Sequence, residues 1–193
     1  ICKKAGIKPI IGCEVYVAPK SRFDKVGRDD SPYHLVLLVK NETGYRNLTH
    51  LVSQAYLEGF YYKPRIDREL LEEYHEGLIA LSACLAGEIP QDILNDKLDK
   101  AKEDILWYKN LFGEGNYYLE VQNHGIPEQQ KVNQALAVLS KECGVPLVAT
   151  NDDHYVYRED AQMQDVMLCI QTGKTLADNN RMRFDGDEFY LKS

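Results

Sequence analysis

Short apolar runs alternate with amphipathic, helix-like stretches along this chain, and no other feature limits its possible folds so strongly. The runs are rich in β-branched or large apolar residues and cover 8–17, 34–39, 77–82, 117–121 and 146–150. Runs of this length and composition are typical of strands. Strands that alternate with helices predict parallel βα units, and such units place functional groups at the carboxyl ends of the strands. The sequence therefore predicts an α/β domain with a parallel sheet.

Helices are expected between these runs, wherever apolar residues recur at helical spacing. They are predicted at 43–56, from Asp67 to Leu71, at 90–94, at 96–111, from Pro127 to about Gly144, and at 158–171. Asn41 or Thr43 can cap the first of them, and Pro127 suits a first helical turn. The charged stretch 20–31, which contains Gly27 and Asp29-Asp30, predicts a loop.

Composition indicates one folded, soluble domain. The chain has 193 residues, of which 44% are hydrophobic, enough to bury one sizeable core. Its formal net charge of -7 argues against a surface that holds nucleic acid by charge alone. Any contact with DNA is therefore expected to be local, or to be made by other parts of a larger protein.

The cysteine pattern predicts a reduced, cytoplasmic protein. The chain has five cysteines, an odd number, widely spaced and without a C-x-x-C pair. No signal peptide is recognisable, and no apolar run approaches the roughly 18 residues of a membrane-spanning helix. The start, Ile1 to Gly6, has the pattern of a helix end without an initiator Met, which suggests a chain that begins inside a larger protein.

Asp152-Asp153-His154 is the sharpest local signal of a functional site, because it directly follows the last predicted strand. In an extended chain, residues two apart face the same side, so Asp152 and His154 can converge on one metal ion. A polar turn after a strand is the simpler alternative.

Four more residues in or beside the strands have side chains that can bind metal: Glu14, His34, Cys84 and His124. Glu14 interrupts an apolar strand, where a carboxylate is rarely buried unless it is paired or bound to metal. A salt bridge or an exposed strand face would explain it equally well. His34 can be a core histidine, Cys84 a small buried apolar residue, and His124 a turn residue. Together, however, carboxylate, imidazole and thiolate groups that meet at one end of the strands form a site that suits zinc, or iron or manganese.

Several motifs, in this order and spacing, resemble the PHP (polymerase and histidinol phosphatase) domain of bacterial DNA polymerase III alpha subunits. They are Gly12-Cys13-Glu14, Tyr33-His34-Leu35, the segment 41–48 (N-E-T-G-Y-R-N-L), the segment 81–88 (L-S-A-C-L-A-G-E) and the segment 149–155 (A-T-N-D-D-H-Y). The 41–48 and 149–155 motifs are characteristic of the polymerase branch. The resemblance covers nearly the whole chain.

The resemblance implies a distorted (β/α)7 barrel of the PHP type, with up to three metal ions at its mouth. It implies metal ligands at Glu14, His34, Cys84, Asp152 and His154, and catalytic roles for Asp152 and His154. His124 is expected at the same mouth of the barrel and is a sixth candidate ligand. The opening H-x-H pair of the family, an acidic residue soon after it and its T-D-H motif have no counterpart here. The barrel is therefore expected to lack its first βα units, and its site to bind metal weakly or not at all.

The function implied by the resemblance is metal-dependent phosphoesterase or 3′–5′ exonuclease chemistry within a DNA-directed DNA polymerase. Two alternatives remain open: a non-catalytic scaffold that docks the separate proofreading subunit, and a free-standing PHP phosphatase for small molecules. The implied partners are DNA, the proofreading exonuclease subunit and other subunits of the polymerase III holoenzyme, with no membrane. Residues 1–173 are expected to form the partial PHP domain and 174–193 a linker toward the polymerase palm domain. Exposed strand edges and an apolar flank would favour self-association.

Overall fold

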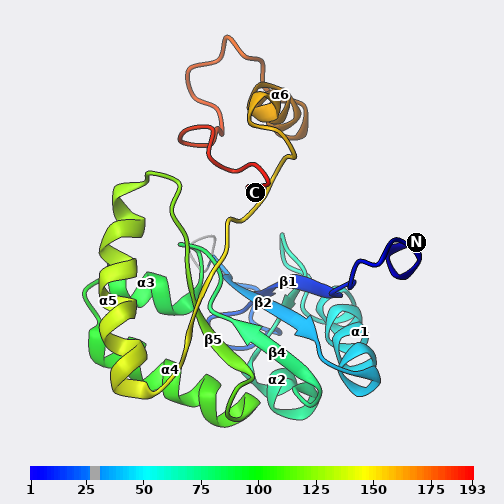
Figure 1. The fold of residues 1–193 in the computed structure, drawn as a ribbon, viewed down its shortest axis with the longest axis vertical. Helices are drawn as coiled ribbons and strands as arrows, with labels where there is room; N and C mark the ends of the chain where they lie inside the picture. The colour runs from blue at the N-terminus through cyan, green and yellow to red at the C-terminus, as the bar shows by residue number, and fades with distance from the viewer. Residues whose placement is uncertain (27–30) are drawn as a thin grey trace.

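The computed structural model describes residues 1–26 and 31–193 and confirms the α/β class. Gly27 and Asp29-Asp30 of the expected loop lie outside the described residues. The strands are β1 (Gly12–Val17), β2 (Tyr33–Val39), β3 (Arg65–Ile66), β4 (Leu78–Leu81), β5 (Tyr117–Val121) and β6 (Leu147–Ala149). Within the described residues they form one sheet in the order β3-β1-β2-β4-β5-β6 (Figure 1).

Helices flank this sheet and agree with the predicted positions to within a few residues. They are α1 (Glu42–Leu57), α2 (Arg68–Tyr74), α3 (Glu88–Leu94), α4 (Leu98–Phe112), α5 (Pro127–Cys143) and α6 (Ala161–Thr172). Short 3-10 turns cover Cys2–Ala5 and Arg158–Asp160. Helices α3, α4 and α5 lie beside one part of the sheet, and α1 and α2 beside the other (Figure 1). No helix in the described residues is long and apolar enough to cross a membrane.

The sheet is mostly parallel, but the predicted parallel arrangement fails at β2. This strand runs antiparallel to both of its neighbours, β1 and β4, whereas β1 with β3, β4 with β5 and β5 with β6 are parallel. The described residues between β1 and β2 form no helix. A parallel pair needs a long crossover, whereas an antiparallel pair can be joined by a loop, so this connection favours reversal.

The core lies between the helices and one face of the sheet. Val15, Leu35, Leu37, Ala80 and Leu119 point to that face, and each is at most 5% exposed. Because side chains alternate along a strand, the neighbours of these residues point to the opposite face. Strand β1 is therefore buried on one face only, with Val15 and Val17 buried and Glu14 exposed, although its apolar run 8–17 would also suit a strand buried on both faces.

The ends of the helices follow the expected chemistry. The Asn41 side chain accepts a hydrogen bond from the Gly44 backbone N–H (3.0 Å), and Pro127 stands in the first turn of α5. Gly44 is required for close packing, because a Cβ there would lie 1.8 Å from the carbonyl oxygen of Gly77. The start of α1 is thereby held against the residue that precedes β4.

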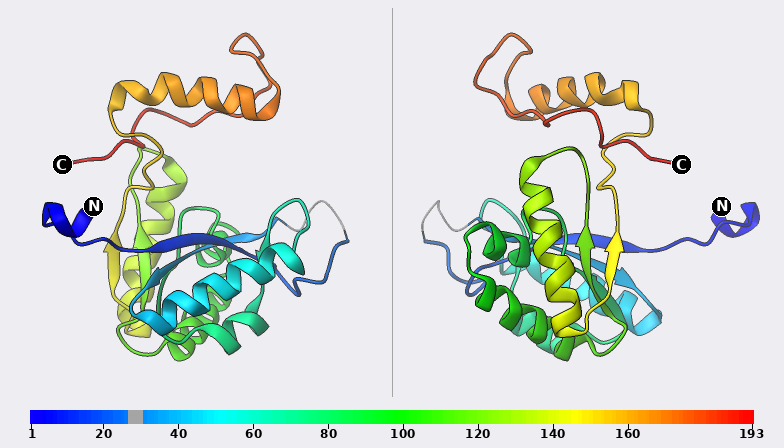
Figure 2. Two further views of the ribbon diagram at one scale, coloured as in Figure 1. Left: turned by 90° about the vertical axis from the view of Figure 1, so that its right-hand side faces the viewer. Right: turned by 60° about the vertical axis from the view of Figure 1, so that its left-hand side comes forward.

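Helix α6 and the C-terminal segment lie together on one side of the sheet layer (Figure 2). The segment does not simply lead away, because Phe189 is only 6% exposed and the Asn151 side chain donates to the carbonyl oxygen of Tyr190 at 2.6 Å. Arg181 also pairs with Asp165 of α6. Residues 181–190 thus pack against the segment that follows β6, and a domain boundary at residue 173 stays a prediction.

Candidate metal centre

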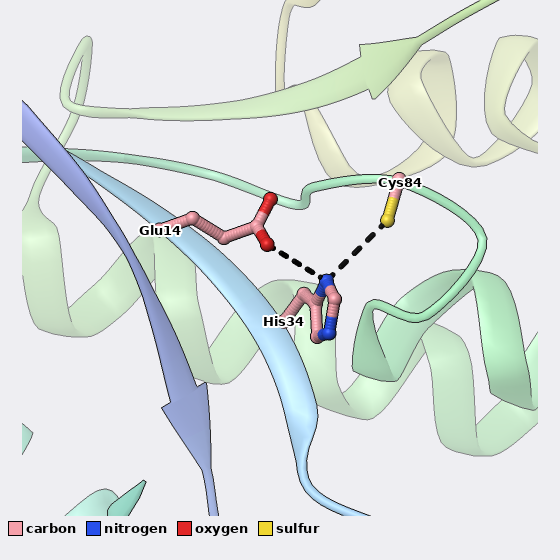
Figure 3. A group of neighbouring side chains, drawn as sticks. All are labelled: Glu14, His34 and Cys84. Carbon is pink, nitrogen blue, oxygen red and sulfur yellow. Dashed lines mark hydrogen bonds and ion pairs between the residues drawn. The ribbon is translucent and has the colours of Figure 1, made fainter. Parts of the chain in front are cut away.

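Glu14 on β1, His34 on β2 and Cys84 in the turn after β4 converge on one another (Figure 3). The Glu14 carboxylate lies 2.9 Å from Nδ1 of His34, and the Cys84 sulfur lies 3.6 Å from the same nitrogen. One potential ligand atom from each residue lies within 4.8 Å of those from the other two. The three side chains form a compact mixed group of oxygen, nitrogen and sulfur atoms.

The reversed strand β2 brings His34 to Glu14. In the β1–β2 register, Tyr16 stands opposite His34 and Glu14 opposite Val36, so Glu14 and His34 are diagonal neighbours on one face. That is the face opposite the helices, because Val15 and Leu35 point into the core. The antiparallel pairing therefore creates the carboxylate–imidazole contact.

A strained turn after β4 directs Cys84 toward His34. Ala83 has a φ of 62°, a left-handed conformation that is uncommon for residues with a Cβ. The turn is fixed to the start of β2, where the His34 backbone N–H donates to the Ala86 carbonyl at 3.0 Å. Strain of this kind persists only where surrounding contacts hold it, and here it places the sulfur beside the imidazole.

The group is electrostatically coupled. The hydrogen bond with Cys84, and then that with Glu14, raise the pKa of His34 to about 10 although burial opposes the shift. The hydrogen bond from His34 in turn lowers the pKa of Glu14, against the opposing effect of burial. Both contacts thus favour the protonated imidazole, and a metal ion at this position must displace that proton.

The donor set and its spacing fit a metal ion. Bond lengths of about 2.0–2.3 Å to zinc imply ligand atoms roughly 3.3–3.8 Å apart in a tetrahedron. The sulfur–nitrogen distance of 3.6 Å lies in that range, and the carboxylate is closer because it is hydrogen-bonded to the imidazole. Carboxylate, imidazole and thiolate together suit zinc best, and iron or manganese where carboxylates dominate.

Asp152 and His154, both predicted ligands, lie outside this compact group, but their side chains interact electrostatically with Glu14. Burial raises the pKa of Asp152, the imidazole of His154 opposes the shift, and the Glu14 carboxylate adds to it. Asp152 has a φ of 48°, and its carbonyl oxygen lies 2.8 Å from Nδ1 of His154. Nδ1 is thus engaged with the backbone, which leaves Nε2 as the nitrogen that can bind a ligand.

His124, the sixth candidate, has both ring nitrogens in hydrogen bonds. Nε2 lies 2.6 Å from the Asn151 carbonyl oxygen, and Nδ1 lies 2.7 Å from Nε2 of Gln129. The ring is 4% exposed and stacks on Phe189 at 4.0 Å between centroids. Ligation by His124 would break one of these bonds, so the observed contacts are those of a residue that positions the chain near Asn151.

Glu120 was not predicted, yet the structure places a buried carboxylate there. It lies on β5 at 6% exposure, and burial raises its pKa. One carboxylate oxygen bonds with Thr150 and with Gln122, while no partner for the other is found among the described residues. Glu120 lines the same small cavity as Cys84. The signal was an acidic residue in the apolar run 117–121, the same signal that drew attention to Glu14.

The fold and the site define an α/β domain with a candidate metal centre on the sheet face opposite its helices. Comparison with known protein families matches residues 1–124 to the PHP domain. This chain therefore belongs to the PHP domain family. The matched residues include Glu14, His34, Cys84 and His124, whereas Asp152 and His154 lie beyond them.

Among curated proteins, the chain is similar to DNA polymerase III alpha subunits. That of Borreliella burgdorferi is 55% identical over 193 residues, which are 99% of this chain and 17% of the relative. That of Treponema pallidum is 54% identical over 197 residues, with coverage of 100% and 17%. That of Thermus aquaticus is 54% identical over 191 residues, with coverage of 97% and 16%. The chain thus spans about a sixth of the length of these relatives.

Proposed function

We propose that this chain is the PHP domain of a replicative DNA polymerase III alpha subunit and that its metal centre hydrolyses phosphoester bonds in DNA, as a 3′–5′ exonuclease. The observation that carries the proposal is the convergence of Glu14, His34 and Cys84 within 4.8 Å. The identity with polymerase subunits over nearly the whole chain supports the polymerase context. Synthesis of DNA would belong to other parts of such a polymerase.

In this proposal Glu14, His34 and Cys84 hold one ion, and Asp152 and His154 extend the site toward up to three. A bound zinc, manganese or iron ion would supply Lewis acidity toward a phosphoester. Asp152 would accept a proton, since its carboxylate is partly buried and near Glu14. His154 presents Nε2 while the backbone holds Nδ1, and so orients that nitrogen toward a substrate or an ion.

The proposal extends to the architecture and the partners. The sheet would be part of a distorted (β/α)7 barrel, with residues 174–193 connecting it to the polymerase palm domain. The partners would be DNA, the proofreading exonuclease subunit and other holoenzyme subunits. Strands β3 and β6 are the two edge strands of the described sheet. Each has one side on which a further strand could pair, and this supports a sheet that continues into a barrel.

Metal binding by single variants tests the centre. Zinc and manganese affinity would be measured by titration calorimetry for the chain and for His34→Gln and Cys84→Ser, with His50→Gln and the exposed Cys2→Ser as matched controls. Loss of a ligand is expected to weaken binding by at least about 10- to 100-fold, the cost of disturbing even an outer contact of a metal site. Equal affinity in all five proteins would refute the centre.

Activity is tested separately with a 5′-labelled single-stranded oligonucleotide and with bis(p-nitrophenyl) phosphate. Metal-dependent cleavage that is lost in Glu14→Gln and His34→Gln supports the phosphoesterase. A chain that binds no metal and cleaves nothing, but still binds the proofreading subunit, would instead support the scaffold.

A further inference from the structure

A cavity of about 280 Å³ lies between α6 and the returning segment 181–186. Its lining residues come from both sides and include Tyr155, Gln162, Asp165, Arg181, Arg183 and Phe184. This volume lies just below the range of about 300–1,000 Å³ that is usual for ligand pockets, so the cavity suits a ligand no larger than a single nucleotide.

The cavity carries a net positive charge. Arg181 is almost fully buried, with 7% of its side chain exposed, and its guanidinium is held by both oxygens of Asp165. The charge of Asp165 is thereby neutralised, whereas no partner for Nε of Arg181 is found among the described residues. Arg183 also lines the cavity and has no hydrogen bond to any residue that the structure describes. The positive charge of Arg183 is thus available to an anion.

Aromatic and amide groups complete the lining. Phe184, whose ring stacks on Phe189 at 4.8 Å between centroids, and Tyr155 add aromatic side chains to the lining beside which a base can pack, and Gln162 offers an amide that can donate and accept hydrogen bonds. Arginine, aromatic and amide groups around a small cavity are the chemistry that recognises phosphate and base together. Inorganic phosphate alone would leave the aromatic surface unused.

Phe184 connects the cavity to His154, which in the proposed function extends the metal site. Its ring lies 4.6 Å from that of His154, centroid to centroid, in an edge-on arrangement. A ligand in the cavity would therefore lie one aromatic ring away from His154. A nucleotide next to a hydrolysed bond would occupy such a position.

We propose that this cavity binds one nucleotide of a single DNA strand, with its phosphate at Arg183 and its base beside Phe184 and Tyr155. The role beside the metal centre rests on the proposed function, whereas the binding itself does not. Residues of α6 and of segment 181–186 thus form a substrate subsite rather than a passive connection.

The test is binding of thymidine 5′-monophosphate to the 193-residue chain, measured by ligand-observed NMR in the presence of a metal chelator. Arg183→Gln is expected to weaken binding about tenfold, as for the loss of one charge-assisted hydrogen bond. Ala161→Trp, which places a large ring at the cavity wall, is expected to abolish it. Arg46→Gln, the same change on the exposed face of α1, is the control and should bind normally.

Each outcome decides the proposal. It is supported if the monophosphate binds more tightly than thymidine or inorganic phosphate and both cavity variants bind less. Absence of binding, equal affinity for inorganic phosphate, or binding that neither variant changes would overturn it. Glu14→Gln separates the two proposals, because it should lose hydrolysis and keep nucleotide binding. If the chain binds the nucleotide but does not hydrolyse DNA, only the proposed function is refuted.

Discussion

Arg68 provides the sharpest test of how the site's framework is held together. One of its terminal nitrogens donates to Glu88 (3.0 Å) and to Asp104 (2.8 Å), and its guanidinium lies 4.4 Å from the ring of Trp107. Glu88 opens α3, directly after the turn that carries Cys84. The Asp104 side chain is only 3% exposed, so replacement of Arg68 leaves a buried carboxylate with Lys100 as its remaining cationic partner.

Replacement of Arg68 by Met keeps most of the stem and removes the charge. Loss of one partner of a buried ion pair costs about 3–5 kcal/mol, and we expect about 3 kcal/mol because a third of the Arg68 side chain is exposed. For a chain of this size, that lowers Tm by roughly 6–12 °C. Urea unfolding followed by circular dichroism gives the free energy of unfolding.

Arg46→Met is the matched control for this change. Arg46 pairs with Glu42 across one turn of α1, and 77% of its side chain is exposed. The control should cost no more than about 0.5 kcal/mol. If Arg68→Met lowers the free energy of unfolding by less than about 1 kcal/mol, the ion pairs of Arg68 with Glu88 and Asp104 do not stabilise the position of α3, and the reasoning is wrong.

Four further outcomes are expected. Burial, and then a hydrogen bond with Asp104, raise the pKa of Asp92 from 3.8 to about 6. The folded state thus binds this proton more tightly than the unfolded state, so stability contributed by Asp92 falls as pH rises from about 4 to 6. Urea unfolding at several pH values should show that decrease, and Asp92→Asn should remove it. Zinc affinity should rise between pH 6.0 and 7.5, because His34 must lose its proton, and calorimetry that shows no pH dependence would contradict this. Asn41→Ala should cost about 1 kcal/mol in the free energy of unfolding, through loss of the α1 cap. The exposed edge at β6, where Leu147 is 41% exposed, should drive self-association, which a clean monomer in sedimentation would disprove.

The sequence predicted the elements well wherever local chemistry decides them. Asn41 and Pro127 mark helix starts through capping and a fixed φ, and the strand 117–121 has the predicted bounds. Glu14 was singled out because an acidic residue in an apolar strand needs an explanation, and the structure supplies His34 as its partner. These signals lie within a few residues of the feature that they predict.

Features that depend on distant contacts could not be predicted in this way. The antiparallel direction of β2 depends on how the chain returns from β1, and the spacing of apolar residues in the sequence carries no information about that return. The two-residue strand β3 is too short for a pattern, and its pairing comes from Tyr16 and Val17 on β1. The bonds that occupy both nitrogens of His124 come from Asn151 and Gln129, and become visible only once the chain is folded.

The strand order has a consequence for synthesis on the ribosome. Taken from the amino end, each new strand finds its neighbour already made: β2 and β3 join β1, β4 joins β2, β5 joins β4, and β6 joins β5. No strand has to be inserted between two that are already paired. The sheet can therefore grow outward as the chain emerges, without waiting for later segments of the described sheet.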